Sequence, residues 1–281
     1  MNAWTLGSGS RGNGLVLESA GRRLLIDCGF GPRALAARLK AVGIAPESIE
    51  AALVTHEHTD HAQGVERAQH KWRWPVYGAA GTLESLRGIP AKHRHVLDES
   101  TTMALDAFGI ESVLVPHDAS SPMAYVVTAL ASGARVGVAH DLGAVPALLR
   151  QRFLCCDALC IEANHDVTML RNGPYPKALQ ARIRGGRGHL NNDECGGLLA
   201  ELASPALQAV VLLHLSETNN TPELAERAVT SIVRRAGYRG PVRAAAGRTP
   251  ERAFTLGARQ GSMAPFGRPT ARVVEQMSLA L

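Results

Sequence analysis

Four metal-binding side chains occupy six positions of this chain, in the segment His56-Glu57-His58-Thr59-Asp60-His61. At the chain's own residue frequencies, such a pattern is expected ~5 × 10⁻⁴ times by chance, so a polar loop with surface histidines is a poor alternative. The apolar residues 51–55 before it predict a buried strand. Extended residues two positions apart point the same way, so His56 and His58 can hold one ion. The chain then turns, and Asp60 with His61 faces a second point.

Further candidate ligands each follow an apolar strand. His117 comes after residues 113–116, Asp141 after residues 136–140, and His214 after residues 210–213. Open α/β folds place their chemistry beyond strand ends, so we expect these side chains to meet the histidine segment. Imidazole and carboxylate ligands suit zinc, manganese or iron. Two such ions about 3.5–4 Å apart can clamp a bridging hydroxide.

The hydrophobic pattern predicts an α/β chain in which strands precede loops that carry His or Asp. We predict strands at Trp4–Leu6, Leu15–Glu18, Arg23–Asp27, Ala51–Thr55, near Val76, and at Thr102–Leu105, Ile110–Val115, Tyr125–Thr128, Arg135–Ala139, Ala158–Glu162, Ala209–Leu213 and Val242–Ala245. We predict helices at Pro32–Val42, Ala62–Trp72, Val145–Phe153, Pro176–Arg184, Asp193–Leu202 and Pro222–Arg235. The pattern fades after residue 256, so we expect a domain over 1–256 and a basic, flexible tail over 257–281.

Composition excludes several classes of protein. With 281 residues, 46% hydrophobic and 20% charged, the chain is neither disordered nor fibrous. No apolar run reaches the roughly 18 residues of a membrane span. The first residues lack the features of a signal peptide. The five cysteines are scattered and odd in number, which favours a reducing compartment. We therefore expect a cytoplasmic protein.

Positive charge gathers at the C-terminal end. The formal net charge is +5, yet residues 227–281 hold ten arginines, no lysine and two acidic residues. The first 226 residues carry more acidic than basic side chains. Such a region could steer a polyanion toward the protein. A general preference for arginine is the alternative, and composition does not decide between them.

The seven candidate ligands, in this order and roughly this spacing, resemble the metallo-β-lactamase fold superfamily over about residues 1–256. The resemblance implies an α/β fold, a four-layer αβ/βα sandwich with the metals at one edge of two facing sheets. It implies one metal on His56, His58 and His117, a second on Asp60, His61 and His214, and Asp141 bridging them. Asp27 matches the superfamily's first-motif aspartate, which supports the ligands; a plain turn aspartate is the alternative.

Several segments resemble the WalJ/YycJ-like branch, which is similar to ribonuclease Z. They are Gly7-Ser8-Gly9-Ser10-Arg11-Gly12-Asn13, Glu162-Ala163-Asn164-His165-Asp166, Gly173-Pro174-Tyr175-Pro176, Gly188-His189-Leu190-Asn191-Asn192 and His214-Leu215-Ser216-Glu217-Thr218-Asn219-Asn220. The branch implies phosphodiester cleavage, including 5′-to-3′ exonuclease activity on DNA, with His189 protonating the leaving oxygen. Asn191 stands where a serine is expected, and His140 where a small polar residue is expected. Neither the long arm of ribonuclease Z nor an extra domain is visible, which predicts an open site.

Weaker candidates surround this set. Ser8, Ser10 and Asn13 belong to a Gly/Ser loop that could offer groups to a phosphate, or form a plain hairpin. His165 could contact substrate or metal, or be a buried structural residue. Asn219 and Asn220 could bind substrate, or only fix their loop and the helix after it.

We therefore expect a hydrolase with two divalent metal ions, zinc or manganese, that cleaves nucleic acid, DNA more than RNA, with a metal-bridging hydroxide. Asp60 would orient the attacking water or accept its proton, and His189 would act as the acid. A small-molecule hydrolase, such as a cyclic phosphodiesterase, is the alternative on the same fold. A metal-bound interaction protein without catalysis is disfavoured by the complete ligand set. The sequence indicates no membrane association and no protein partner.

Overall fold

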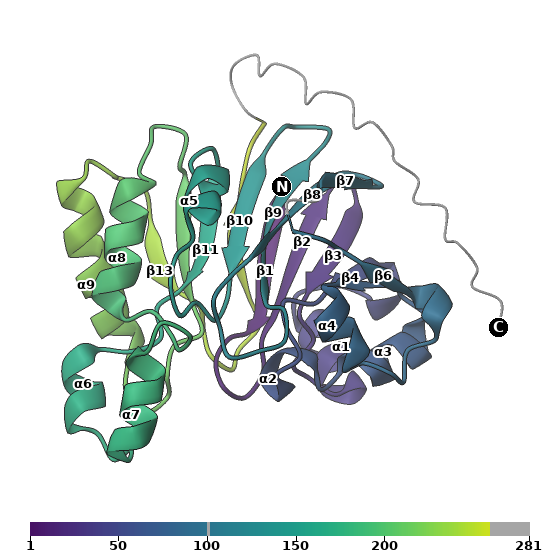
Figure 1. The fold of residues 1–281 in the computed structure, drawn as a ribbon. Helices are drawn as coiled ribbons and strands as arrows, with labels where there is room; N and C mark the ends of the chain where they lie inside the picture. The colour runs from purple at the N-terminus through teal and green to yellow at the C-terminus, as the bar shows by residue number, and fades with distance from the viewer. Residues whose placement is uncertain (100–101, 259–281) are drawn as a thin grey trace.

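The computed structural model describes residues 1–99 and 102–258 (Figure 1). The predicted tail, residues 257–281, lies outside the described residues except for its first two positions. No helix within the described ranges is long and apolar enough to cross a membrane.

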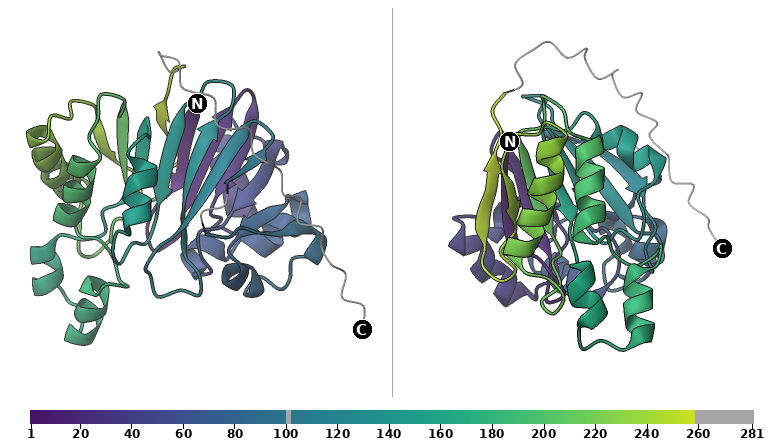
Figure 2. Two further views of the ribbon diagram at one scale, coloured as in Figure 1. Left: turned by 45° about the horizontal axis from the view of Figure 1, so that its top comes forward. Right: turned by 90° about the vertical axis from the view of Figure 1, so that its left-hand side faces the viewer.

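Two mixed β-sheets stack face to face, each with seven strands among the described residues (Figures 1 and 2). The first sheet has the order β14 (Glu251–Thr255), β1 (Asn2–Gly7), β2 (Gly14–Ser19), β3 (Arg22–Ile26), β4 (Ile49–Leu53), β5 (Val76–Gly78) and β6 (Arg94–Val96). The second has the order β13 (Val242–Ala244), β12 (Ala209–Leu213), β11 (Ala158–Glu162), β10 (Arg135–Ala139), β9 (Met123–Ala129), β8 (Phe108–Leu114) and β7 (Thr102–Leu105).

Helices cover the outer face of each sheet, which completes the four-layer α/β sandwich that the family resemblance implies (Figure 1). The first sheet carries α1 (Pro32–Ala41), α3 (Val65–Trp72) and α4 (Ala80–Glu84), with the short α2 (Thr59–Ala62) at its edge. The second carries α5 (Ala147–Phe153), α8 (Asn192–Glu201) and α9 (Pro222–Arg235). Two helices, α6 (Val167–Asn172) and α7 (Lys177–Arg184), project together beyond one end of the second sheet (Figures 1 and 2). Short 3₁₀ turns lie at Pro46–Ser48 and Ala91–His93.

Apolar side chains fill three layers. In β3, Leu24 and Ile26 belong to the core between the sheets, while Leu25 points to the helices on the outer face. Both faces of this strand are therefore buried, which explains its continuous apolar sequence. Tyr125 crosses the central layer, and its hydroxyl donates to the carbonyl of Val54 at 2.7 Å. That bond ties the second sheet to the chain just before the histidine segment.

The structure differs from the predicted elements at several places. The predicted helix Ala62–Trp72 is divided into α2 and α3 at Gly64, whose amide donates to the Cys28 carbonyl at 2.9 Å. A Cβ atom there would lie 1.8 Å from the Phe30 carbonyl oxygen, so only glycine permits this approach. The prediction lacks α4, β6, α6 and β14. Strand β14 gains its stability by pairing with β1, at the other end of the chain.

Candidate active site

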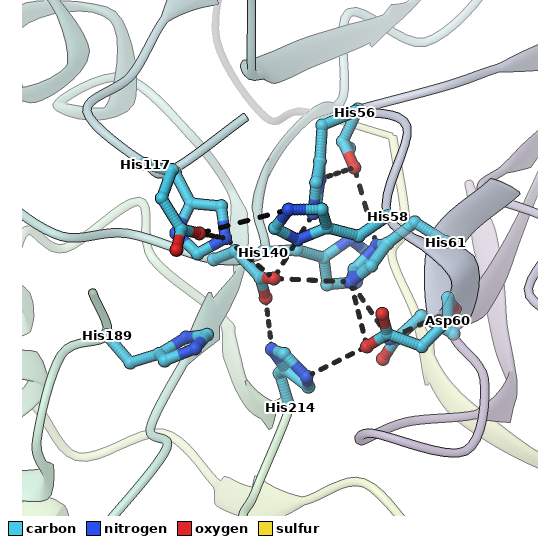
Figure 3. A network of polar contacts seen from close by, with 12 residues as sticks. His56, His58, Asp60, His61, His117, His140, His189 and His214 are labelled. Carbon is cyan, nitrogen blue, oxygen red and sulfur yellow. Dashed lines mark hydrogen bonds and ion pairs between the residues drawn. The ribbon is translucent and has the colours of Figure 1, made fainter. Parts of the chain in front are cut away.

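The seven candidate ligands follow the ends of four strands at one edge of the sandwich; Asp60 and His61 lie in the short helix α2, and the other five lie in loops. The histidine segment follows β4, His117 follows β8, Asp141 follows β10, and His214 follows β12. Strands β10, β11 and β12 are parallel, so their carboxyl ends meet at the same edge. Figure 3 shows the labelled imidazoles gathered around a common centre.

One cluster contains His56, His58, His117 and Asp141, whose candidate ligand atoms all lie within 4.8 Å of one another. Asp141 Oδ2 is 3.3 Å from His56 Nε2 and 3.4 Å from His117 Nε2. Both of these buried nitrogens lack a hydrogen-bond partner among the described residues. A buried polar atom without a partner costs free energy, so these donors fit a bound divalent cation.

A second cluster contains Asp60, His61 and His214, again within 4.8 Å. Asp60 Oδ2 is 3.5 Å from His61 Nε2 and 3.3 Å from His214 Nε2. Asp141 adjoins this cluster as well, with Oδ2 3.5 Å from His61 Nε2 and its other oxygen against His214 Nδ1. Its carboxylate therefore lies between the two clusters, the place that a bridging ligand would take.

Asp27 holds the histidine segment from behind. Its fully buried carboxylate accepts hydrogen bonds from His61 Nδ1 at 2.7 Å and from His140 Nδ1 at 2.8 Å. It also accepts from the Thr55 amide at 2.8 Å. Burial acts to raise the pKa of Asp27, but the charges and hydrogen bonds of His61 and His140 hold that pKa below its usual range. Because His61 binds Asp27 through Nδ1, its Nε2 faces the cluster.

Asp27 and His214 adopt a left-handed backbone conformation, which ordinarily favours glycine. The φ angle is +61° at Asp27 and +52° at His214. Such strain persists only where the surroundings fix the conformation. At His214 the backbone amide donates to Ser8 Oγ at 2.7 Å, and the carbonyl accepts from Asn164 Nδ2 at 3.0 Å. The loop is thus fixed on both sides of its ligand.

His189 pairs with a carboxylate that the sequence analysis does not nominate. His189 Nδ1 donates to Glu162 Oε1 at 2.6 Å, and Glu162 Oε2 accepts from the amides of Leu142 and Leu190 at 2.8 and 3.1 Å. Burial acts to raise the pKa of Glu162, but the neighbouring His189 lowers it to about 2. Burial acts to lower the pKa of His189, whereas Glu162 raises it above its usual value. Glu162 therefore fixes one ring nitrogen of His189.

The N-terminal loop supports the site chiefly from inside. Asn13 Oδ1 accepts from the Gly9 amide at 2.8 Å, and Asn13 Nδ2 lies 3.0 Å from His61 Nε2 and 3.3 Å from Asp60 Oδ2. Ser8 is buried beneath His214, whereas Ser10 lines the open cleft in front of the clusters.

The remaining candidates do not line the cleft. His165 is buried, neither of its ring nitrogens has a hydrogen-bond partner among the described residues, and burial lowers its pKa to about 4. Asn220 Nδ2 donates to the Ala163 carbonyl at 2.9 Å, which fixes its loop. The side-chain amide of Asn219 is buried and has no hydrogen-bond partner in the described ranges. Thr221, not an asparagine, caps α9.

The cleft itself has a volume of about 270 Å³. Its lining also contains Tyr175, which belongs to one of the segments that carry the resemblance to the WalJ/YycJ-like branch. Four further lining residues were not predicted: Asp118, Leu179, Arg182 and Ile183. Asp118 Oδ1 lies 3.2 Å from His117 Nε2, and its other oxygen accepts from Arg182 Nε at 2.7 Å. Its position directly after His117 is the one signal that could have indicated it.

The chain is similar in sequence to a known family and to two named relatives. Residues 22–215 match the family described as "Beta-lactamase superfamily domain". The chain is 31% identical over 237 residues to exodeoxyribonuclease YycJ of Bacillus anthracis, covering 83% of this chain and 89% of the relative. It is also 31% identical over 226 residues to exodeoxyribonuclease WalJ of Streptococcus pneumoniae, covering 78% of this chain and 83% of the relative.

A solved structure confirms the fold. The metallo-β-lactamase fold protein YhfI of Bacillus subtilis superposes with a TM-score of 0.69 at 17% identity, covering 90% of this chain and 100% of YhfI. The family match covers well over half of the chain, and the His and Asp clusters occupy the edge where the two sheets meet. The chain therefore belongs to the beta-lactamase superfamily and is a metal-dependent hydrolase with the metallo-β-lactamase fold.

Proposed function

We propose that this hydrolase is a two-metal phosphodiesterase that removes nucleotides from the 5′ end of DNA. The observation that carries the proposal is the position of Asp141, whose carboxylate contacts both histidine clusters. The names of the relatives support DNA as the substrate, since two relatives that align over most of their length are called exodeoxyribonucleases.

The donor set suits two divalent ions, zinc or manganese. His56, His58 and His117 would hold one ion, Asp60, His61 and His214 the other, and Asp141 both. With the ions bound, the site gains Lewis acids that neutralise phosphodiester charge and lower the pKa of a water molecule. The buried, unpartnered nitrogens of His56 and His117 support this assignment.

The side chains would divide the proton transfers. Asp60 stands at the second cluster, where its carboxylate can orient the attacking water and accept its proton. His189 faces the same cleft with Nδ1 held by Glu162, which leaves its other nitrogen to donate a proton to the leaving oxygen. The acid and the water-orienting carboxylate would thus act within one cleft, as in-line displacement requires.

Cys28, Cys156, Cys160 and Cys195 are buried and form no disulfide among the described residues. We therefore place the enzyme in a reducing compartment, the cytoplasm.

A time course on 5′-labelled and 3′-labelled duplex DNA tests the activity, with Mn²⁺, Zn²⁺ or a chelator and with Asp60→Ala as the control. We expect metal-dependent release of mononucleotides from the 5′ end, absent in Asp60→Ala. Release from the 3′ end would reverse the polarity, and intact DNA with every metal would overturn the nuclease proposal.

The size of the cleft favours a second candidate, a small cyclic phosphodiester. A volume of about 270 Å³ lies near the lower end of small-molecule sites, which begin at about 300 Å³. This candidate predicts turnover of a cyclic nucleotide at a higher kcat/KM than any DNA, with no dependence on DNA length.

A further inference from the structure

One side of the cleft is formed by α7 and the turn before it. Leu179, Arg182 and Ile183 lie three and four residues apart on one face of α7, and Tyr175 precedes the helix. These four residues are called the α7 wall here. We propose that the α7 wall binds the terminal nucleotide of a single DNA strand, with its apolar side chains against the base and Arg182 on a phosphate. This inference rests on the proposed function.

The α7 wall and the rest of the cleft differ in chemistry. Tyr175, Leu179 and Ile183 are only partly buried, so they present apolar surface to the cleft. The rest of the cleft contains charged and metal-binding groups, among them Asp60 and His117. A nucleotide has the same division, a flat apolar base joined to a charged phosphate. Stacking on an aromatic ring is a common way of holding an unpaired base.

The projecting segment that contains α6 and α7 is positively charged. Residues 167–187 contain five basic side chains and no acidic one. They are Arg171, Lys177, Arg182, Arg184 and Arg187. This segment includes the whole of α6 and α7, which extend away from the sandwich next to the site (Figures 1 and 2). A strand leaving the cleft along it would therefore exchange counterions for basic side chains.

Arg182 is held at the cleft but remains open to solvent. Its guanidinium binds the Asp118 carboxylate at the cleft, yet the side chain is 66% exposed. Guanidinium has five N–H donors in a planar fork that matches phosphate, so donors remain after the bond to Asp118. An exposed pair of this kind is weak, and a phosphate can compete with Asp118 for it. Asp118 thus holds Arg182 in place before substrate binds.

The cleft is small. At about 270 Å³ the cleft is smaller than typical small-molecule sites of about 300–1,000 Å³, which favours entry of one nucleotide unit over a base pair. The terminal nucleotide must leave its partner strand before it reaches the clusters. A single-stranded 5′ end should therefore be degraded faster than a blunt duplex end.

The test compares two variants with two matched controls, using the metal-loaded full chain. Tyr175→Ala removes the ring and Tyr175→Phe retains it; Arg182→Gln removes a charge at the cleft and Arg235→Gln removes one at the far end of α9. We would measure kcat and KM on a 5′-labelled single-stranded 20-mer at several salt concentrations, together with bound metal.

We expect Tyr175→Ala to raise KM for the 20-mer by about 5- to 150-fold, the range of base stacking on one aromatic ring. Arg182→Gln should reduce the slope of log KM against log salt by about 0.7, as for one lost phosphate contact on a single strand. Both variants should retain bound metal and the kcat on the 20-mer. Tyr175→Phe and Arg235→Gln should resemble the wild type.

The outcomes separate the two proposals. If the wild type degrades no DNA, the proposed function fails and this inference fails with it. If the wild type degrades DNA but Tyr175→Ala and Arg182→Gln keep its KM and salt slope, the α7 wall alone is refuted. A loss of bound metal or of kcat in either variant would show that the wall only supports the structure, which also overturns the inference.

Discussion

The two sides of the cleft are built in different ways. On the side that contains the two histidine clusters, His56, His61 and Asp141 are almost fully buried. His61 there donates a hydrogen bond to Asp27, which lies behind it. On the α7 wall, Arg182 is mostly exposed and is held by a single carboxylate. Fixed geometry suits bond cleavage, because reacting groups must be in place beforehand. Exposed side chains on a projecting helix suit the choice of substrate, since they can change without disturbing the ligands.

The largest expected effect comes from Asp141→Asn, which keeps the shape of the central side chain and removes its charge. Both histidine clusters lose the carboxylate between them, so bound metal and activity should fall together, activity by more than about 10⁴-fold. Metal content after gel filtration and turnover of bis(p-nitrophenyl) phosphate would check this. Asp193→Asn, exposed in the first turn of α8, is the control. An Asp141→Asn enzyme with full metal content and activity would contradict the central role.

A smaller and more selective loss is expected for His189→Ala. Loss of a general acid should lower kcat on DNA by about 10²- to 10⁴-fold, with KM and metal content retained. Bis(p-nitrophenyl) phosphate has a leaving group that needs no proton, so its turnover should fall far less. His70→Ala, exposed on α3, is the control. Equal loss on the two substrates would assign His189 to positioning rather than to proton transfer.

Gly188→Ala tests the backbone that joins the two sides. The Gly188 carbonyl accepts from His117 Nδ1 at 2.9 Å, and a Cβ atom there would lie 2.1 Å from the Ile183 carbonyl oxygen. Alanine must therefore displace the end of α7, and the free energy of unfolding should fall by about 1–3 kcal/mol. Gly186→Ala is the matched control, because its Cβ would meet nothing within 4 Å. Urea unfolding of both variants decides; equal stability would show that α7 moves independently of His117.

Much of the fold could be predicted from the sequence, because strands and helices there agree with their tertiary surroundings. Helix α9 is predicted at Pro222–Arg235, the bounds that the structure shows, since proline and a threonine cap mark its start. Strand β14 could not be predicted, because its stability comes from pairing with β1 across the length of the chain. Gly64 divides a predicted helix for a reason that lies in the Phe30 backbone, outside the helix itself.

The candidate site divides in the same way. Metal chemistry requires particular side chains, so the histidine segment and the residues after apolar strands could be named, and the structure brings them together. Glu162 is the last residue of an apolar strand, and its contact with His189 depends on how two distant loops meet. The left-handed backbone of Asp27 and His214 has no signal in residue type. The α7 wall depends on the angle at which α7 leaves the sandwich, which no local pattern specifies.

The smallest effect is expected for Arg11→Gln, next to Ser10 on the other rim of the cleft. Arg11 Nε binds Glu217 Oε2 at 2.9 Å, while Arg248 also binds both oxygens of Glu217, at 3.1 Å each. Exposed pairs of this kind contribute about 0–1 kcal/mol, and Arg248 would keep Glu217 in place. Because Arg11 does not line the cleft, KM for the single-stranded 20-mer should change by less than about twofold. A twofold change in KM corresponds to a free energy inside the range of about 0–1 kcal/mol for an exposed pair. The same kinetic assay used for Arg182→Gln measures this, and a KM increase as large as that of Arg182→Gln would place the strand on both rims.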